Sequence, residues 1–225
     1  MSRSLEELEG ARQPAPPAVL VHATPAYRLG RALTRLLWAL LFWPRHEGRR
    51  RIPATGGALL CVNHQSFLDI PLVSHVTARH VCFVARESLA RSGPLAWIMR
   101  RSGAVLVRRG TADRAALREM VAHLEQGDLV AVFPEGTRSA DGSLGRFRAG
   151  ALLAARLAGV PVLPLGIRGA FEAWPRQRRL PRPRRIAVRV GEPLEPTAPD
   201  ALETLRERIA ALIGDGRFAS LAPEP

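Results

Sequence analysis

The chain of 225 residues contains no lysine, so all 33 of its basic side chains are arginines. A chain without lysine cannot form a lysine Schiff base or a Walker-type phosphate loop, and mechanisms that need either are excluded. Only 20 residues are acidic, which leaves a formal net charge of +13. This excess of arginine indicates an anionic partner: nucleic acid, an acidic lipid surface, a phosphorylated substrate or an acidic carrier protein.

Cysteine and aromatic residues are scarce. The two cysteines, Cys61 and Cys82, each lie inside an apolar run. This excludes a disulfide framework and a cysteine-rich zinc site, and predicts buried free thiols in a reducing compartment. Aromatic residues make up 5% of the chain, with a single tyrosine, so a surface that stacks single-stranded bases is disfavoured. Hydrophobic residues make up 47% of the chain, which is enough for a folded core.

The N-terminal part is predicted to contain neither a secretory signal nor a membrane-spanning helix. Residues 1–25 are predicted to be a flexible lead, because prolines interrupt them and they contain no apolar signal core. Residues 26–47 are predicted to contain an amphipathic helix that ends at Pro44 and lies on a membrane surface. Its uncharged part runs only from Leu36 to Trp43, whereas ~20 residues span a bilayer. A helix packed on its own domain is the alternative. Five leucines form one face and three arginines the opposite face: Leu29, Leu33, Leu36, Leu37 and Leu40, and Arg28, Arg31 and Arg35.

Beyond residue 47, short apolar runs alternate with helix-like segments. Apolar runs bounded by turn residues predict strands, and helical periodicity closed by glycine predicts helices. This order predicts an α/β fold with a mostly parallel sheet flanked by helices. Residues 176–185 hold six arginines and are predicted to form an exposed loop. The predicted strands are 58–62, 81–85, 104–107, 129–133, 162–167 and 186–190, and the predicted helices are 111–126, 149–158 and 200–213.

His64 and Asp69 form the first candidate site, after the predicted strand 58–62. Strand ends are where α/β folds place ligand sites. On one ideal helix the two residues would point ~140° apart, so a pair requires His64 in the turn and a helix that begins near Ser66. A carboxylate bound to one ring nitrogen fixes the tautomer and makes the other nitrogen a general base for a hydroxyl. The alternative is an ordinary surface histidine beside a helix that Ser66 caps.

The second candidate site follows the predicted strand 129–133 and reads Phe133-Pro134-Glu135-Gly136-Thr137-Arg138-Ser139. A glycine-containing turn after a strand offers backbone N–H groups, and an arginine beside it can bind a phosphate. The alternative is a plain surface loop, because Gly136 and the Asp141-Gly142 pair are both turn signals.

Together, the two segments resemble the glycerolipid acyltransferases of the lysophosphatidic acid acyltransferase type, the bacterial PlsC-like family. The first reads Asn-His-x-Ser-x-x-Asp and the second Phe-Pro-Glu-Gly-Thr-Arg-Ser. Further similarity lies between Arg51 and Leu194. Gly103–Arg109 resembles a strand motif that ends in arginine, although position 108 is arginine where the family often has aspartate. Val160–Leu165 resembles a fourth, apolar motif, and Phe147–Gly150 resembles Phe-Lys-x-Gly with Arg148 in place of lysine.

The resemblance implies that residues 48–225 form an acyltransferase domain with His64 and Asp69 as catalytic residues. His64 takes the proton from the free hydroxyl of a lysophospholipid, and the oxygen attacks an acyl thioester without a covalent enzyme intermediate. No metal or cofactor is expected beyond the co-substrate, acyl-CoA or acyl carrier protein. The implied phosphate site, in which Glu135 orients arginines or ligand hydroxyls, consists of Arg109, Glu135, Gly136 and Arg138.

The implied product is phosphatidic acid, made from 1-acylglycerol-3-phosphate by a peripheral enzyme. We expect it on the anionic cytoplasmic face of the cell membrane, without a nucleic-acid partner. Another lyso-lipid, such as a lyso-ornithine lipid, is an alternative acceptor. An arginine-rich nucleic-acid-binding module is a second alternative, which residues 176–185 favour but which leaves both motifs unexplained. A lipid hydrolase with Ser66 as nucleophile is the third, and it lacks the Gly-x-Ser-x-Gly turn.

Overall fold

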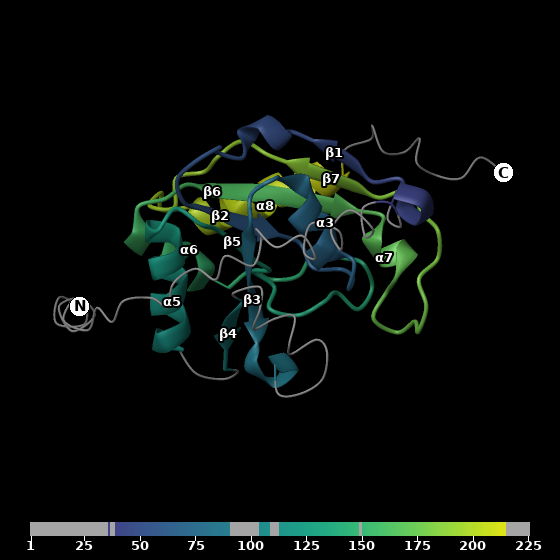
Figure 1. Ribbon diagram of the computed structural model, residues 1–225, viewed down its shortest axis with the longest axis horizontal. Helices are drawn as coiled ribbons and strands as arrows, with labels where there is room; N and C mark the ends of the chain where they lie inside the picture. The colour runs from purple at the N-terminus through teal and green to yellow at the C-terminus, as the bar shows by residue number, and fades with distance from the viewer. Residues whose placement is uncertain (1–35, 37–38, 91–103, 109–112, 149, 215–225) are drawn as a thin grey trace.

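A sheet of seven strands runs through the molecule in the order β1-β7-β6-β2-β5-β3-β4 (Figure 1). The computed structural model describes residues 36, 39–90, 104–108, 113–148 and 150–214. Neighbouring strands are parallel except for the antiparallel pair β6 and β7, which confirms the predicted α/β fold with a mostly parallel sheet. The strands are β1 (Arg45–Glu47), β2 (Ala58–Val62), β3 (Val81–Arg86), β4 (Val105–Val107), β5 (Leu129–Val132), β6 (Val162–Arg168) and β7 (Ala187–Val190).

The two central strands, β2 and β5, are buried along their whole length. Such continuous apolar strands are typical of a parallel sheet that is covered on both faces. Successive side chains point to opposite faces, so Leu60 packs into one apolar cluster and its neighbours Leu59 and Cys61 into another. The sheet therefore separates two cores.

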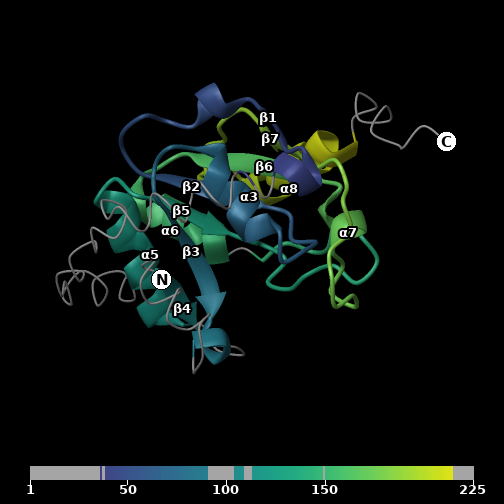
Figure 2. The same ribbon diagram turned by 45° about the vertical axis from the view of Figure 1, so that its right-hand side comes forward.

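Helices cover both faces of the sheet (Figure 2). The core on one side holds residues of α5, α6 and α8, and α8 contacts β6 while α5 contacts α6. The core on the other side holds residues of α3 and α7 together with Phe42. The helices are α3 (Asp69–Val76), α5 (Arg114–Glu125), α6 (Gly150–Ala158), α7 (Ala170–Ala173) and α8 (Ala201–Gly214), with short 3-10 helices η2 (Arg49–Arg51) and η3 (Glu87–Ala90).

The six predicted strands agree with β2 to β7 to within one residue at each end. Strand β1 was not predicted; its residues Arg45–Glu47 pair with Ala187–Arg189 of β7. Three residues with two charges carry too little apolar pattern to mark a strand. Residues 176–185 lie in irregular structure and are mostly exposed, as predicted.

Only the end of the predicted N-terminal helix lies within the described residues. Its last helical residue is Phe42, which is 2% exposed and packs into the core. The side chains of Leu36, Leu40 and Trp43 are 59%, 63% and 55% exposed. Residues 1–35, 37 and 38 are outside the described part, and with them the flexible lead, the arginine face and most of the leucine face. Within the described ranges, no helix combines the length and the apolarity needed to cross a bilayer.

Candidate active site

The predicted pair forms: the Nδ1–H of His64 donates to Oδ2 of Asp69 at 2.8 Å. Asp69 is fully buried, whereas the His64 side chain is 17% exposed. The same Oδ2 accepts the backbone N–H groups of Gln65 and Ser66, at 2.7 and 2.8 Å. A carboxylate oxygen only accepts hydrogen bonds, so Nδ1 is the donor of this pair, and in the neutral ring Nε2 then holds the lone pair. The imidazole is thus set up to accept a proton at Nε2.

The turn that makes this pair possible differs from the prediction in one detail. Helix α3 begins at Asp69 and its cap residue is Leu68, so Ser66 is not the helix cap. Asp69 itself accepts the N–H groups of Gln65 and Ser66, because its carboxylate folds back over the turn. The hydroxyl of Ser66 donates instead to the carbonyl of Trp174 at 2.7 Å. This bond directs the hydroxyl proton of Ser66 to α7 rather than to His64.

His64 is also held from its backbone and from its ring face. Its N–H donates to Oε1 of Glu135 at 2.8 Å, and its carbonyl accepts the N–H of Ser139 at 2.8 Å. The imidazole stacks on Phe133, with ring centroids 3.9 Å apart and an interplanar angle of 18°. The second candidate segment therefore supports the first, because β2 and β5 are parallel neighbours and end side by side.

Asn63 fixes the point where the chain leaves β2. Its Nδ2 donates to the carbonyl of Ile167 at 2.9 Å, and its Oδ1 accepts the N–H of Ile167 at 2.7 Å. The side-chain amide thus pairs with β6 as a strand backbone would, while the backbone itself turns toward His64. Asn63 has no exposed surface, and these two bonds satisfy both polar atoms of its buried amide.

Glu135 orients backbone rather than arginine side chains. Oε1 accepts the N–H of His64, and Oε2 accepts the N–H of Gly145 at 2.9 Å. Glu135 thereby joins the histidine turn to residues 144–147, a contact that was not predicted. Burial raises the pKa of Glu135, and the two backbone N–H groups oppose that rise. Glu135 is 7% exposed.

Arg138 lies over an aromatic ring beside the histidine turn. Its guanidinium carbon is 3.6 Å from the centre of the Phe67 ring. Among the described residues, its Nη1 is buried and has no hydrogen-bond partner. Burial and the charge of Arg176 lower the pKa of Arg138. A partly buried cation whose buried nitrogen binds no carboxylate of the described residues is suited to an anionic ligand.

Of the other two predicted phosphate-site residues, the structure describes Gly136 but not Arg109. Gly136 has a positive φ of 67°, and its carbonyl accepts a hydrogen bond from Arg86 at 2.6 Å. Arg109 lies outside the described residues. Its neighbour Arg108 binds Glu87 at 3.2 Å on the exposed surface, so the arginine at position 108 forms an ion pair there.

A cavity of about 810 Å³ adjoins the second segment. Four arginines line it: Arg138, Arg146, Arg148 and Arg176. Only Arg138 and Arg148 belong to the motifs identified in the sequence. Arg146 and Arg176 were missed, although clusters of arginine around Phe147 and in residues 176–185 are visible in the sequence. Asp141 and Glu135 also line the cavity, so its arginines outnumber its carboxylates.

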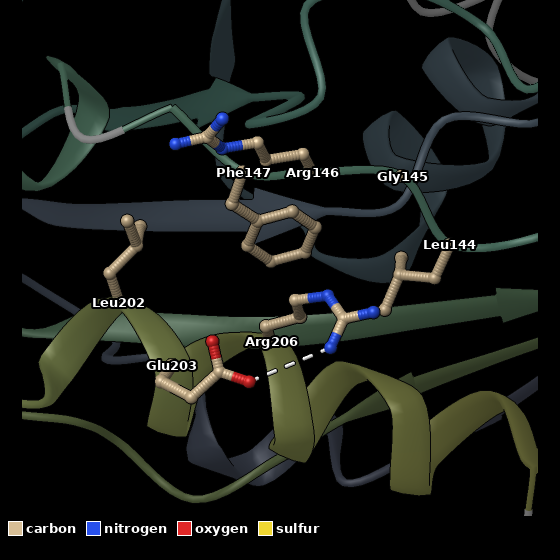
Figure 3. A pocket seen from close by; sticks show the side chains of 7 residues that line it. All are labelled: Leu144, Gly145, Arg146, Phe147, Leu202, Glu203 and Arg206. Carbon is tan, nitrogen blue, oxygen red and sulfur yellow. Dashed lines mark ion pairs between the residues drawn. The ribbon is translucent and has the colours of Figure 1, made fainter.

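A second cavity, of about 430 Å³, shares Gly145, Arg146, Phe147 and Leu202 with the first. Figure 3 shows the ring of Phe147 pointing toward α8, which carries Leu202, Glu203 and Arg206. Arg206 forms an ion pair with Glu203 at 3.5 Å. The two cavities therefore adjoin each other at residues 145–147 and Leu202.

Neither cysteine has the environment of a nucleophile. Cys61 and Cys82 are free and buried, as predicted. Burial raises the pKa of both thiols, that of Cys82 to about 12. Both thiols therefore stay protonated near neutral pH.

Comparisons with known proteins agree with this arrangement. A 1-acyl-sn-glycerol-3-phosphate acyltransferase of Chlamydomonas reinhardtii is 31% identical over 79% of the chain and 56% of its own length. A lyso-ornithine lipid O-acyltransferase of Pseudomonas aeruginosa is 34% identical over 60% of the chain and 51% of its own length. The chain thus spans about half the length of these curated relatives.

The fold and the family agree as well. The crystal structure of the 1-acyl-sn-glycerophosphate acyltransferase PlsC from Thermotoga maritima matches with a TM-score of 0.70 and 28% identity, over 91% of the chain and 87% of that protein. The acyltransferase family model matches residues 44–168. These residues are more than half of the chain and include the His64–Asp69 pair and Arg138. The chain therefore belongs to the acyltransferase family.

Proposed function

We propose that the chain transfers an acyl group from an acyl thioester to the free hydroxyl of a lysophospholipid. Nε2 of His64 removes the hydroxyl proton, and the oxygen attacks the thioester carbonyl. The carbon–sulfur bond then breaks, the proton on His64 passes to the departing sulfur, and an ester and a free thiol are the products. The observation that carries the proposal is the His64–Asp69 pair, because it leaves a base nitrogen on a partly exposed ring.

Asp69 acts through His64 and is a positioning residue. Its carboxylate holds the ring by Nδ1 and stabilises the imidazolium that forms when Nε2 takes the proton. No metal and no cofactor other than the acyl donor enters this reaction. The donor carries its acyl group on coenzyme A or on an acyl carrier protein, and both donors present the same thioester to His64.

The acceptor that the site fits best is 1-acylglycerol-3-phosphate, which gives phosphatidic acid. Arg138, with its unpartnered Nη1, supports a phosphate-bearing acceptor. The other arginines of the 810 Å³ cavity add to this support, since several cations hold a phosphate better than one. A lyso-ornithine lipid has no phosphate, and a relative with that name makes it the second candidate.

We place the enzyme on the membrane as a peripheral protein, at the cytoplasmic face. The exposed apolar side chains of Leu36, Leu40 and Trp43 support a helix end that enters the lipid interface. The net charge of +13 supports an anionic lipid surface. The acyl chain of the acceptor then stays in the bilayer during the reaction.

An acyl-transfer assay tests the proposal. Purified protein, a labelled acyl thioester and a panel of lyso-lipids with and without phosphate are combined in vesicles. We expect labelled phosphatidic acid from 1-acylglycerol-3-phosphate and much slower labelling of the lyso-ornithine lipid. Faster labelling of the lyso-ornithine lipid would identify it as the acceptor instead. If no acceptor in the panel became labelled, the proposed reaction would be refuted.

A further inference from the structure

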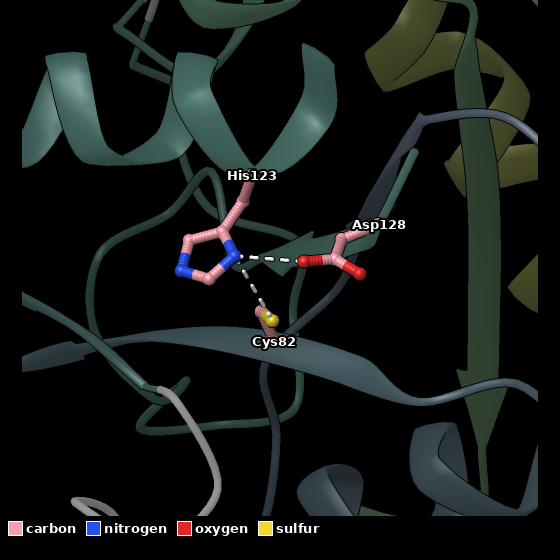
Figure 4. A group of neighbouring side chains, drawn as sticks. All are labelled: Cys82, His123 and Asp128. Carbon is pink, nitrogen blue, oxygen red and sulfur yellow. Dashed lines mark hydrogen bonds and ion pairs between the residues drawn. The ribbon is translucent and has the colours of Figure 1, made fainter. Parts of the chain in front are cut away.

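Three polar side chains meet at the amino-terminal end of the parallel strands, opposite the end that carries His64 (Figure 4). Cys82 lies near the start of β3, His123 in the last turn of α5, and Asp128 directly before β5. Nδ1 of His123 is 2.8 Å from Oδ2 of Asp128 and 3.7 Å from Sγ of Cys82. The three ligand atoms all lie within 4.8 Å of one another.

The cluster has no part in the proposed acyl transfer. β3 and β5 are parallel, and Cys82 is level with Val130 at the start of β5. His64 follows the opposite, carboxyl end of β2, and β2 is parallel to β5. The length of the sheet thus separates the cluster from His64.

The arrangement is not that of a thiol nucleophile with a histidine base. In such a relay the carboxylate and the thiol bind opposite nitrogens of the imidazole. Here both lie against the same nitrogen, Nδ1 of His123. Cys82 is also 1% exposed, which denies a substrate access to its sulfur. Three potential ligand atoms that converge on one point are typical of a cation site.

The distances can be compared with those of a tetrahedral zinc site. Zinc bonds of about 2.3 Å to sulfur and about 2.05 Å to nitrogen place the two ligand atoms about 3.6 Å apart. The sulfur–nitrogen distance in the cluster is 3.7 Å. In the same zinc geometry, the nitrogen and oxygen ligand atoms are about 3.3 Å apart. The distance between His123 and Asp128 is 2.8 Å, so it has to increase by about 0.5 Å when a cation replaces the proton between them.

We propose that Cys82, His123 and Asp128 bind a Zn²⁺ ion that joins β3, α5 and β5. His80 is positioned to provide a fourth ligand after a side-chain rotation, because its Nδ1 is 3.7 Å from the sulfur of Cys82. The Asp128 side chain is 26% exposed and gives the ion a route from solvent. Binding releases the thiol proton to solvent, since the thiolate is the ligand.

The charges around the cluster favour a cation. Asp128 brings a carboxylate into the cluster, and a second carboxylate, that of Glu119, lies one turn before His123 on α5. Arg79, three residues before Cys82 in the chain, carries an opposing charge. Its guanidinium donates to the carbonyls of Pro53, Gly56 and Gly127, so it is bound to backbone rather than to the carboxylates.

Cobalt substitution tests the site directly. The purified full chain is freed of metal with a chelator and titrated with Co²⁺, and then with Zn²⁺. We expect a thiolate-to-cobalt charge-transfer band that saturates at one ion per chain and that Zn²⁺ removes. Zn²⁺ is also expected to raise the melting temperature of the wild type, because the ion binds the folded state. No charge-transfer band with the wild type would overturn the proposal.

Two variants and one matched control identify the ligands. Cys82→Ser is expected to lose the band, while Cys61→Ser keeps it because that equally buried thiol lies outside the cluster. A band that survives Cys82→Ser, or one that only Cys61→Ser removes, would refute the assignment. Asp128→Asn keeps the thiol and an acceptor for His123, so it decides the question if Cys82→Ser does not fold. We expect at least ~10- to 100-fold weaker binding in Asp128→Asn, and unchanged binding would contradict Asp128 as a ligand.

Discussion

The guanidinium carbon of Arg138 lies 3.6 Å from the centre of the Phe67 ring. Phe67 is in the same turn as His64, three residues further along the chain. The ring also tilts against Trp174, with centroids 5.5 Å apart. One turn of the chain therefore carries the base and supports the cation that we assign to the acceptor phosphate.

Phe67→Ala is expected to raise the KM for 1-acylglycerol-3-phosphate by about 2- to 30-fold, because a cation–π contact contributes about 0.5–2 kcal/mol. The change in kcat should be smaller, and Phe67→Tyr should retain the wild-type KM. Phe67 is 49% exposed, so Ile70→Ala, at 42% exposed, is the matched control for lost apolar surface. An equal rise in KM with Ile70→Ala would assign the effect to lipid contact.

Arg138→Ala is expected to raise the KM for the phosphorylated acceptor by roughly 10- to 150-fold, equivalent to about 1.5–3 kcal/mol for a charged hydrogen bond. The KM for the thioester should change little. Because Phe67 acts by holding Arg138, adding Phe67→Ala to Arg138→Ala should have almost no further effect. Additive effects of the two changes would show that Phe67 acts independently, and a rise in donor KM alone would move Arg138 to the donor site.

His64→Ala is expected to lower kcat by about 10²–10⁴-fold with an unchanged far-UV circular dichroism spectrum, because a general base contributes that much. Asp69→Asn should lower kcat to a similar extent and change its pH profile, since the imidazole loses its anionic partner. A folded His64→Ala protein with near wild-type turnover would exclude the general base.

Ser66 provides the comparison between acyl transfer and hydrolysis by a serine nucleophile. Its hydroxyl donates to the carbonyl of Trp174, so Ser66→Ala should lower stability and leave kcat within a few-fold of the wild type. The wild-type enzyme should also resist a serine-directed phosphonate. Inactivation by the phosphonate together with loss of turnover in Ser66→Ala would favour the hydrolase.

Glu135 is expected to make stability depend on pH. Burial raises its folded-state pKa above the ordinary value of 4.5. The folded chain therefore holds this proton at a pH where the unfolded chain has lost it. The contribution is complete below pH 4.5 and is lost as the pH rises through the folded-state pKa. Denaturant unfolding of the wild type and of Glu135→Gln, compared from pH 4 to 7, measures it. We expect the wild-type free energy of unfolding to fall relative to the variant as pH rises; a constant or rising difference would contradict the raised pKa.

The double variant Leu36→Glu with Leu40→Glu should reduce binding to anionic vesicles. Both side chains are more than half exposed, and charges on this face cannot enter the lipid interface at low cost. Activity on a short-chain, water-soluble acceptor should be largely retained. The control is Leu180→Glu. Leu180 is 74% exposed and lies in the loop of residues 176–185, away from this helix in the sequence. Co-sedimentation with vesicles over a salt series is the measurement, and equal binding by wild type and double variant would place this helix on its own domain.

The sheet was predictable because its strands carry their own signal. The buried runs of β2, β5 and β6 are continuous and end at turn residues, so their limits were correct to within one residue. β1 was not predictable, because Arg45–Glu47 has no apolar pattern and is a strand only through pairing with β7.

The candidate site was predictable in its residues and less so in their roles. His64 and Asp69 meet as expected, because both lie in one turn. Glu135 accepts the N–H groups of His64 and Gly145, which are far apart in the sequence. No local sequence pattern predicts such contacts. The same holds for Arg176, which reaches the cavity from the loop after α7.

The amide of Asn63 has a consequence for the timing of catalysis. Its two hydrogen bonds to Ile167 extend the ladder of β6 beyond the end of β2. The turn that follows is thereby ordered when the sheet forms, before any lipid arrives. The entropy lost in ordering His64 then belongs to folding and not to each turnover. We therefore expect little reorganisation energy at this end of the sheet: the base is preorganised by a side chain that touches neither the acyl donor nor the acceptor.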